Sequence, residues 1–203
     1  MIVLRAAVIA LVALAFPPAA ALAQDAQPNC APDGQIMLLQ DYPTFDMSGR
    51  GWRAVHQQPG CEAAAADLIA RYRTMQRTIL AQDEALTLRF HEGQVRAGLG
   101  DIAAALALFA ATHDASPEAG SAWNPYVDAT IAFLKKDRPA LEAARDKLAA
   151  ASPPPDFDAR ATEYEQRTGQ RPVWPPNLDV VKAFVTCFDR TYREAYADPA
   201  CHT

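Results

Sequence analysis

The chain has 203 residues, of which 50% are hydrophobic and only 8% aromatic, and alanine supplies much of the apolar content. Helix-forming residues dominate and β-branched residues are few, which predicts an all-α protein. The formal net charge is −5 and no long run of like charge occurs, so the sequence lacks the basic face of a nucleic-acid-binding protein.

The N-terminal residues 1–23 have the pattern of a cleavable secretory signal. Arg5 supplies a positive charge, residues 6–16 form an apolar run, and a pair of prolines precedes the small-x-small sequence Ala21-Leu22-Ala23. The apolar run is about half the length that a membrane-spanning helix needs. We therefore expect a periplasmic or secreted protein that keeps no membrane span after cleavage.

The four cysteines predict disulfides, because an exported chain meets an oxidising compartment. Three connectivities are possible. The positions favour Cys30 with Cys61 and Cys187 with Cys201, since each pair lies near one end of the chain and ties an irregular tail to a helix. None of the spacings is C-x-x-C, so neither a thioredoxin-like redox site nor a haem attachment is expected.

After the signal, residues 24–50 contain scattered prolines and glycines and predict an irregular arm with at most one brief helix. Helical periodicity then extends from 51 to 150. The predicted helices cover residues 51–58, 61–81, 83–97, 101–113, 116–136 and 137–150, with Asp83, Asp101 and Asp137 as N-caps and Ile79 and His113 on buried faces.

A proline-rich connection follows over residues 151–176 and contains one short helix, 158–168, that ends at Gly169. Asn177 is the predicted cap of the last helix in the C-terminal segment 177–203. Its apolar positions extend as far as Tyr192 at heptad spacing, so we expect one continuous helix that covers the preceding pair.

The predicted caps Asp101 and Asp137 are 36 residues apart, a period typical of helical repeats. The segment 86–117 resembles a tetratricopeptide repeat in the relative spacing of five residues: Gly93, Gly100, Ala105, Phe109 and Pro117. The small residues would let paired helices approach closely. Glu92, Arg96 and Thr112 depart from the family's pattern, and the flanking pairs match less well.

The resemblance covers residues 51–150, about half of the mature chain. It implies a short α-solenoid of antiparallel helix pairs closed by a C-terminal capping helix. An ordinary antiparallel bundle whose loops happen to give this period is the alternative.

We find no catalytic, cofactor-binding or metal-binding motif. The four histidines form no H-E-x-x-H pattern, no serine lies in G-x-S-x-G, and Gly98-Leu99-Gly100 lacks the strand and the third glycine of a phosphate loop. A structural role is expected for each histidine, and no cofactor is expected.

The resemblance implies that the first helix of each pair lines a concave face. The outward positions there form a candidate partner groove: Arg50, Arg53, Thr87, Phe90, Gln94, Asn124 and Asp128. An exposed Phe90 among polar neighbours would suit the edge of a peptide or protein.

The sequence therefore favours an exported interaction module whose partner is another envelope protein or a peptide, with the oligomeric state left open. Two alternatives remain. One is a carrier with a ligand pocket under Phe184 and Phe188, and the other is an enzyme with an all-α active site that no motif reveals.

Overall fold

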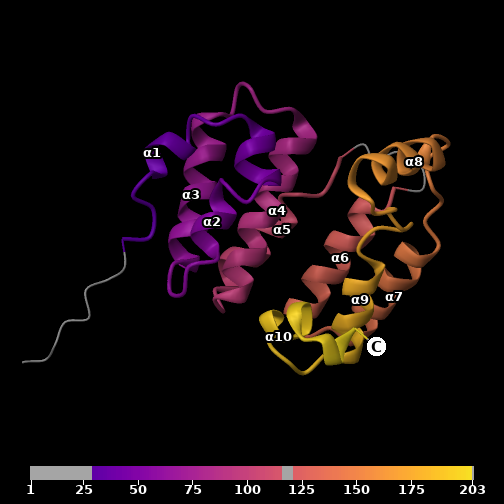
Figure 1. Cartoon of the computed structure of the whole chain (residues 1–203). Helices are drawn as coiled ribbons and strands as arrows, with labels where there is room; N and C mark the ends of the chain where they lie inside the picture. The colour runs from indigo at the N-terminus through magenta and orange to yellow at the C-terminus, as the bar shows by residue number, and fades with distance from the viewer. Residues whose placement is uncertain (1–28, 116–120, 203) are drawn as a thin grey trace, which may run out of the picture.

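The computed structural model describes residues 29–115 and 121–202. Within these ranges the regular structure is entirely helical, with ten α-helices, one π-helical turn and one 3₁₀ turn that pack largely in chain order as antiparallel neighbours (Figure 1). The all-α prediction is confirmed. The predicted signal segment, residues 1–23, lies outside the described residues.

The N-terminal half begins with α1 (Gly34–Met37) and η1 (Pro43–Met47), a single π-helical turn. Four helices follow in sequence, each packed on the next: α2 (Trp52–His56), α3 (Glu62–Met75), α4 (Gln82–Gly98) and α5 (Ile102–Ala110). Phe45 of η1 stacks on Tyr72 of α3 with 3.7 Å between the ring centroids. The described part of the arm, residues 29–50, thus supplies core side chains and two helical turns rather than an irregular tail.

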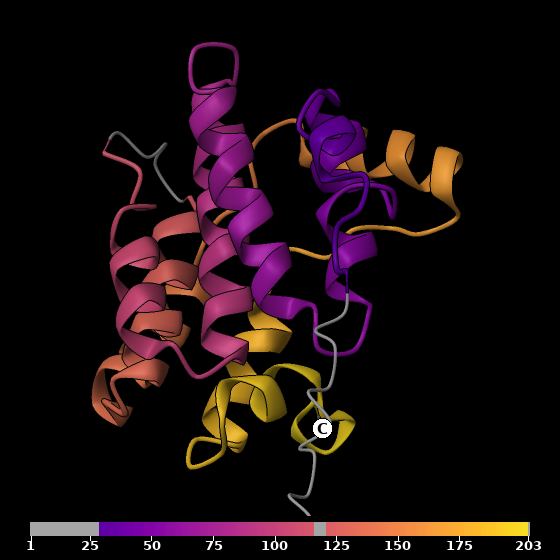
Figure 2. The ribbon, with the colours of Figure 1, turned by 90° about the vertical axis from the view of Figure 1, so that its left-hand side faces the viewer.

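The C-terminal half contains α6 (Trp123–Leu134), α7 (Arg138–Ala149), α8 (Phe157–Thr168), α9 (Leu178–Thr186), α10 (Tyr192–Ala197) and the 3₁₀ turn η2 (Pro199–Cys201). α9 packs against both α6 and α7, and α10 reaches back to α4. In Figures 1 and 2, α10 lies at the lower end of the molecule beside both halves. The C-terminal segment therefore contacts a helix of the N-terminal half, α4.

Two disulfides join the predicted partners. Cys30 is bonded to Cys61 and Cys187 to Cys201. The first bridge ties the arm to the start of α3, and the second ties η2 to the end of α9.

Local capping signals placed several helix starts correctly. The Asp101 carboxylate accepts a hydrogen bond from the Ala104 amide at 3.3 Å, and Asp137 accepts one from Ala140 at 3.0 Å. Each bond satisfies an amide that has no partner within the helix. Gly169 ends α8 with φ of +75°, a conformation that glycine adopts at little cost.

Other boundaries were wrong. α3 ends at Met75 rather than residue 81, and Ile79 is 78% exposed instead of buried. Asp83 does not cap α4, because that helix begins one residue earlier and the Glu84 carboxylate accepts the Ala81 amide at 3.0 Å. α5 ends at Ala110, so His113 lies beyond it and is exposed.

The predicted fifth helix, 116–136, begins later than expected. α6 begins at Trp123, and residues 116–120 lie outside the described ranges. Asn124 and Pro125, which follow the first residue, occupy its first turn.

The last helix is not continuous. α9 stops at Thr186, and Thr191 caps a separate helix, α10, by accepting from the Glu194 amide at 3.3 Å. Lys136 stabilises the break, since its ammonium donates to the carbonyls of Phe188 at 2.7 Å and Arg190 at 2.8 Å. These carbonyls lack helical partners where the chain turns.

Candidate functional site

A cleft of about 390 Å³ lies between α2, α4 and α10, and we call it the α10 cleft. It collects aromatic, basic and amide side chains from both ends of the chain. The lining residues are Trp52, Arg53, His56, Glu62, His91, Gln94, Val95, Gly98, Tyr192, Arg193, Tyr196 and Ala197.

The base of the α10 cleft is organised by Asp46, a fully buried carboxylate on η1. Its Oδ1 accepts a hydrogen bond from the Trp52 indole at 2.8 Å and lies 2.8 Å from His91 Nδ1. Arg53 donates to the main-chain carbonyl of Asp46 and lies 3.4 Å from the carboxylate. Burial alone would raise the pKa of Asp46, but the hydrogen bonds and charges of these partners outweigh it and hold the pKa below its usual value.

Asp46 holds the side chains of Trp52, Arg53 and His91 in fixed orientations. The His91 ring is held in place by its contact with Asp46, with its Nδ1 facing the carboxylate. The indole of Trp52 is anchored at its nitrogen, and the Arg53 guanidinium stacks over the ring at 4.2 Å. The arrangement holds the nearly buried Trp52 ring beside the His91 ring, with 5.7 Å between their centroids.

α10 forms the opposite wall. Tyr192 is 5% exposed, and its hydroxyl is buried beside the Gln94 side chain. Burial and the neighbouring Tyr196 raise the pKa of this phenol, and a hydrogen bond with the Gln94 side chain opposes the rise. Arg193 Nε donates to the Gly98 carbonyl at 3.3 Å, and its Nη2 lies 3.8 Å from Glu62. On α2, burial lowers the pKa of His56.

Of the seven predicted groove residues, the fold brings Arg53 and Gln94 together in the α10 cleft. Phe90 is not exposed as expected, and this part of the prediction was wrong: it is 3% exposed. Its ring packs against Trp123 at 5.2 Å and Tyr126 at 4.9 Å between ring centroids. The first helices of two successive pairs meet there, so Phe90 joins them instead of facing a partner.

The other predicted groove residues do not line the cleft. Asn124 is occupied by hydrogen bonds to the backbone of Asp114, at 2.9 and 3.0 Å. Asp128 pairs with His113 at 2.8 Å. Thr87 is half-buried on α4, and Arg50 is exposed at the end of the arm.

Two of the side chains that depart from the repeat pattern, Glu92 and Arg96, belong to a charged network between α3 and α4. Glu92 is 4% exposed and pairs with Arg73 and with Arg96, the latter at 3.2 Å. Arg96 also reaches Asp67 at 3.0 Å. A buried carboxylate needs positively charged partners. Arg96 is such a partner of Glu92, so the two departures from the repeat pattern compensate each other.

The proposed carrier pocket under Phe184 and Phe188 is replaced by packed core. Both side chains are buried, and Phe184 stacks on Phe133 with 4.6 Å between centroids. Phe188 meets the same ring edge-on at 6.3 Å.

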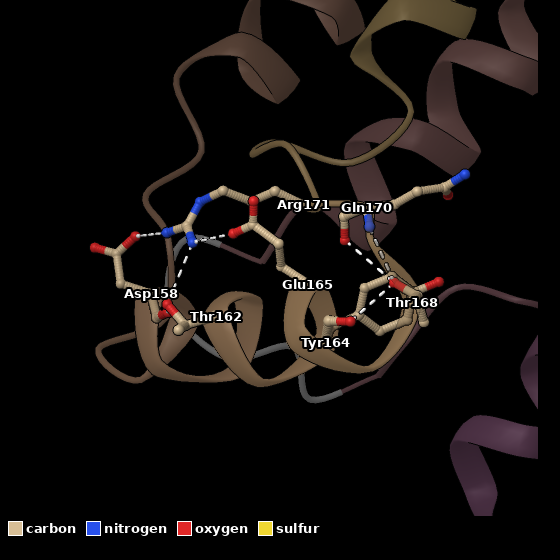
Figure 3. Close-up of polar contacts among 7 residues, drawn as sticks. All are labelled: Asp158, Thr162, Tyr164, Glu165, Thr168, Gln170 and Arg171. Atoms are coloured by element: carbon tan, nitrogen blue, oxygen red, sulfur yellow. Dashed lines mark hydrogen bonds and ion pairs between the residues drawn. The ribbon is translucent and has the colours of Figure 1, made fainter.

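A second polar cluster lies along α8 and is shown in Figure 3. Arg171 donates to Asp158 and Glu165 at 3.1 Å each and to Thr162 at 3.2 Å. The guanidinium is thus occupied by groups of its own neighbourhood. The cluster fastens the extended stretch after Gly169 onto α8, and we assign it a structural role.

Sequence reasoning missed the residues that define the cleft: Asp46, His91, Tyr192 and Arg193. Asp46 lies in the predicted irregular arm, and its contact with His91 spans 45 residues of sequence. No local sequence pattern predicts such a contact.

In the described part of the chain, no group of three or more His, Cys, Asp or Glu side chains is placed to hold a metal ion. None of the helices in residues 29–115 and 121–202 is long and apolar enough to cross a membrane. Searches for similar proteins found no matching protein-family profile, curated protein sequence or solved structure.

Proposed function

We propose that this protein is an exported, tetratricopeptide-like interaction module that captures a partner protein or peptide of the cell envelope in the α10 cleft. The observation that carries the proposal is the cleft itself. It is an open concavity where α2 and α4, the first helices of two successive pairs, meet α10 and present aromatic and charged side chains. Such mixed linings are typical of recognition sites.

Three further features support the proposal. The pairs α2–α3, α4–α5 and α6–α7 follow one another as a helical repeat requires. α9 covers the last pair, as a capping helix would. The two disulfides suit an oxidising compartment, in agreement with the predicted secretory segment.

The experiment is site-specific photocrosslinking from the cleft. A photoreactive residue replaces Gln94 on the cleft wall, and in a matched control it replaces Glu163, which is exposed on α8. Each purified mature protein is incubated with extract of its own cell envelope, irradiated and examined by mass spectrometry.

We expect one adduct that forms from position 94 and not from position 163. An excess of the unlabelled protein should suppress it, whereas excess protein carrying Gly98→Trp, which fills the cleft, should not. Identical adducts from both positions, or none from position 94 in a folded protein, would overturn the proposal.

A further inference from the structure

We infer that the chain associates with a second copy of itself through an exposed apolar surface formed by α1, the end of α3 and the turn that follows α3. We call this surface the α1–α3 edge and define it by Ile36, Leu39, Met75 and Ile79. The inference does not depend on the α10 cleft. It rests on the exposed apolar side chains of the edge, on the contacts that hold them together, and on unpaired charges of both signs around them.

Four large apolar side chains are exposed at the α1–α3 edge. Ile79 is 78% exposed, Leu39 74%, Ile36 65% and Met75 47%. Helical periodicity predicted Ile79 on a buried face, but nothing in the described part of the chain covers it. Single exposed apolar residues are common, whereas a group of them at one edge is typical of an interaction surface.

The four side chains belong to one surface because hydrogen bonds join the segments that carry them. The Gln76 side chain donates to the Leu38 carbonyl at 2.9 Å, and the Ile79 amide donates to the Gln76 carbonyl at 2.9 Å. These bonds hold the turn after α3 against the end of α1. The Leu39 amide donates to the Ile36 carbonyl at 3.0 Å, so these two side chains share one side of the helical turn.

A shallow groove of about 580 Å³ lies between α1 and α3, and its lining includes Leu38, Ala70 and Met75. The exposed side chains of Leu39 and Ile79 follow closely after residues that line this groove. The edge therefore has both receding and protruding apolar surface. A two-fold contact between identical molecules requires such a surface, because each copy must fit the other with the same residues.

Unpaired charges of both signs surround the apolar side chains. Arg71 and Arg77 line the groove, Asp33 precedes α1, and Asp83 lies just after the turn; all four are exposed. Across residues 29–115 and 121–202, none of these four side chains forms an ion pair. A two-fold contact would bring the arginines of one copy opposite the aspartates of the other.

This charge pattern favours a second copy over a membrane surface. Anionic lipids would attract the two arginines but repel the two aspartates. A rim with equal numbers of opposite charges is instead complementary to itself. Two chains of net charge −5 repel each other in general, and ion pairs across the rim offset that repulsion where the copies meet.

Association through the α1–α3 edge leaves the α10 cleft open. Helix α4 begins near the edge at Gln82 and ends at Gly98, whose carbonyl accepts a hydrogen bond from Arg193 of α10. Its 17 residues span about 25 Å. In Figure 2 the turn before α4 lies at the upper end of the molecule and α10 at the lower end. The dimer would thus present two clefts that point away from its interface.

The test is sedimentation velocity on the purified mature protein over concentrations from about 1 μM to about 1 mM. We expect the wild type to pass from monomer to dimer within this range. Ile79→Ser should weaken the dimer about a hundredfold, because a two-fold contact loses this side chain twice. The matched control is Val173→Ser, since Val173 is also 78% exposed but lies beyond α8, and it should leave the association unchanged.

Charge reversal tests self-complementarity without assuming which residues pair. Arg71→Glu with Arg77→Glu makes all four rim charges negative, and Asp33→Lys with Asp83→Lys makes all four positive. Each double variant alone should stay monomeric, because like charges would face each other across the two-fold axis. An equimolar mixture of the two should form a heterodimer.

A wild type that stays monomeric over the whole range, or a dimer that Ile79→Ser does not weaken, would overturn the inference. A mixture of the charge variants that stays monomeric would also overturn it. A monomer that binds anionic lipid vesicles and loses this binding in Ile79→Ser would overturn it and assign the edge to a membrane surface. Photocrosslinking from position 94 does not involve the α1–α3 edge, so failure here and failure of the proposed function are distinguishable.

Discussion

Replacing Gly93 with alanine tests how closely α4 and α5 must approach. A Cβ at this position would lie 2.9 to 3.1 Å from three ring carbons of Phe109. That ring is fully buried and packs against Phe90 with 4.7 Å between centroids, so it has little freedom to retreat. We therefore expect steric overpacking to outweigh the better helix propensity of alanine.

The magnitude follows from two opposing terms. Alanine gains about 1 kcal/mol over glycine inside a helix, and an extra methyl group in a filled core costs about 1 to 3 kcal/mol. The net loss of unfolding free energy should be about 1 kcal/mol. Gly98→Ala in the same helix is the matched control, because a Cβ there meets nothing within 4 Å.

The assay is guanidinium-induced unfolding followed by far-UV circular dichroism, with both variants compared to the wild type. Gly98→Ala should be neutral or slightly stabilising. Adding Phe109→Leu to Gly93→Ala should cost less than the same change in the wild type, because the smaller side chain relieves the contact. Equal stability of Gly93→Ala and Gly98→Ala would contradict the expected steric overlap between a Cβ at position 93 and the Phe109 ring.

Two further predictions concern the acidic pH range and the C-terminal disulfide. The pKa of Asp46 is lower in the folded protein than in the unfolded chain, so its contribution to stability is present above about pH 4 and is lost as the pH falls through the folded value. In urea unfolding at a series of pH values, the free energy of unfolding should fall less steeply towards acidic pH in Asp46→Asn than in the wild type. Equal slopes would contradict the assignment. The Cys187–Cys201 bridge closes a loop of 14 residues, so replacing both cysteines with alanine should lower the free energy of unfolding by about 3 kcal/mol under oxidising conditions. Chemical denaturation measures this difference, which should become smaller when both proteins are reduced.

Sequence reasoning succeeded where the cause of a structure is local. Asp101 and Asp137 each hydrogen-bond an amide three residues ahead, and the cap depends on nothing else. The role of Gly93 was also foreseen, since only a residue without a side chain permits the observed contact with Phe109. The disulfide partners followed from their positions near the two ends of the chain.

Sequence reasoning failed where contacts between distant segments determine the structure. Periodicity continued to Tyr192 and predicted one helix, but the capping box at Thr191 and the Lys136 contacts to two carbonyls interrupt it. Phe90 was placed outward by analogy with a repeat, and the neighbouring α6 covers it with Trp123 and Tyr126. Both errors reflect tertiary contacts that override a local pattern.

The α10 cleft shows why the candidate site was the least predictable feature. Its base depends on Asp46 of the arm and its far wall on Tyr192 and Arg193 of the C-terminal segment, and neither segment belongs to the repeat-like pairs. Helices α2 and α4 alone would offer His91 without the carboxylate that orients it. The lining of the cleft therefore depends on both terminal segments as well as on α2 and α4.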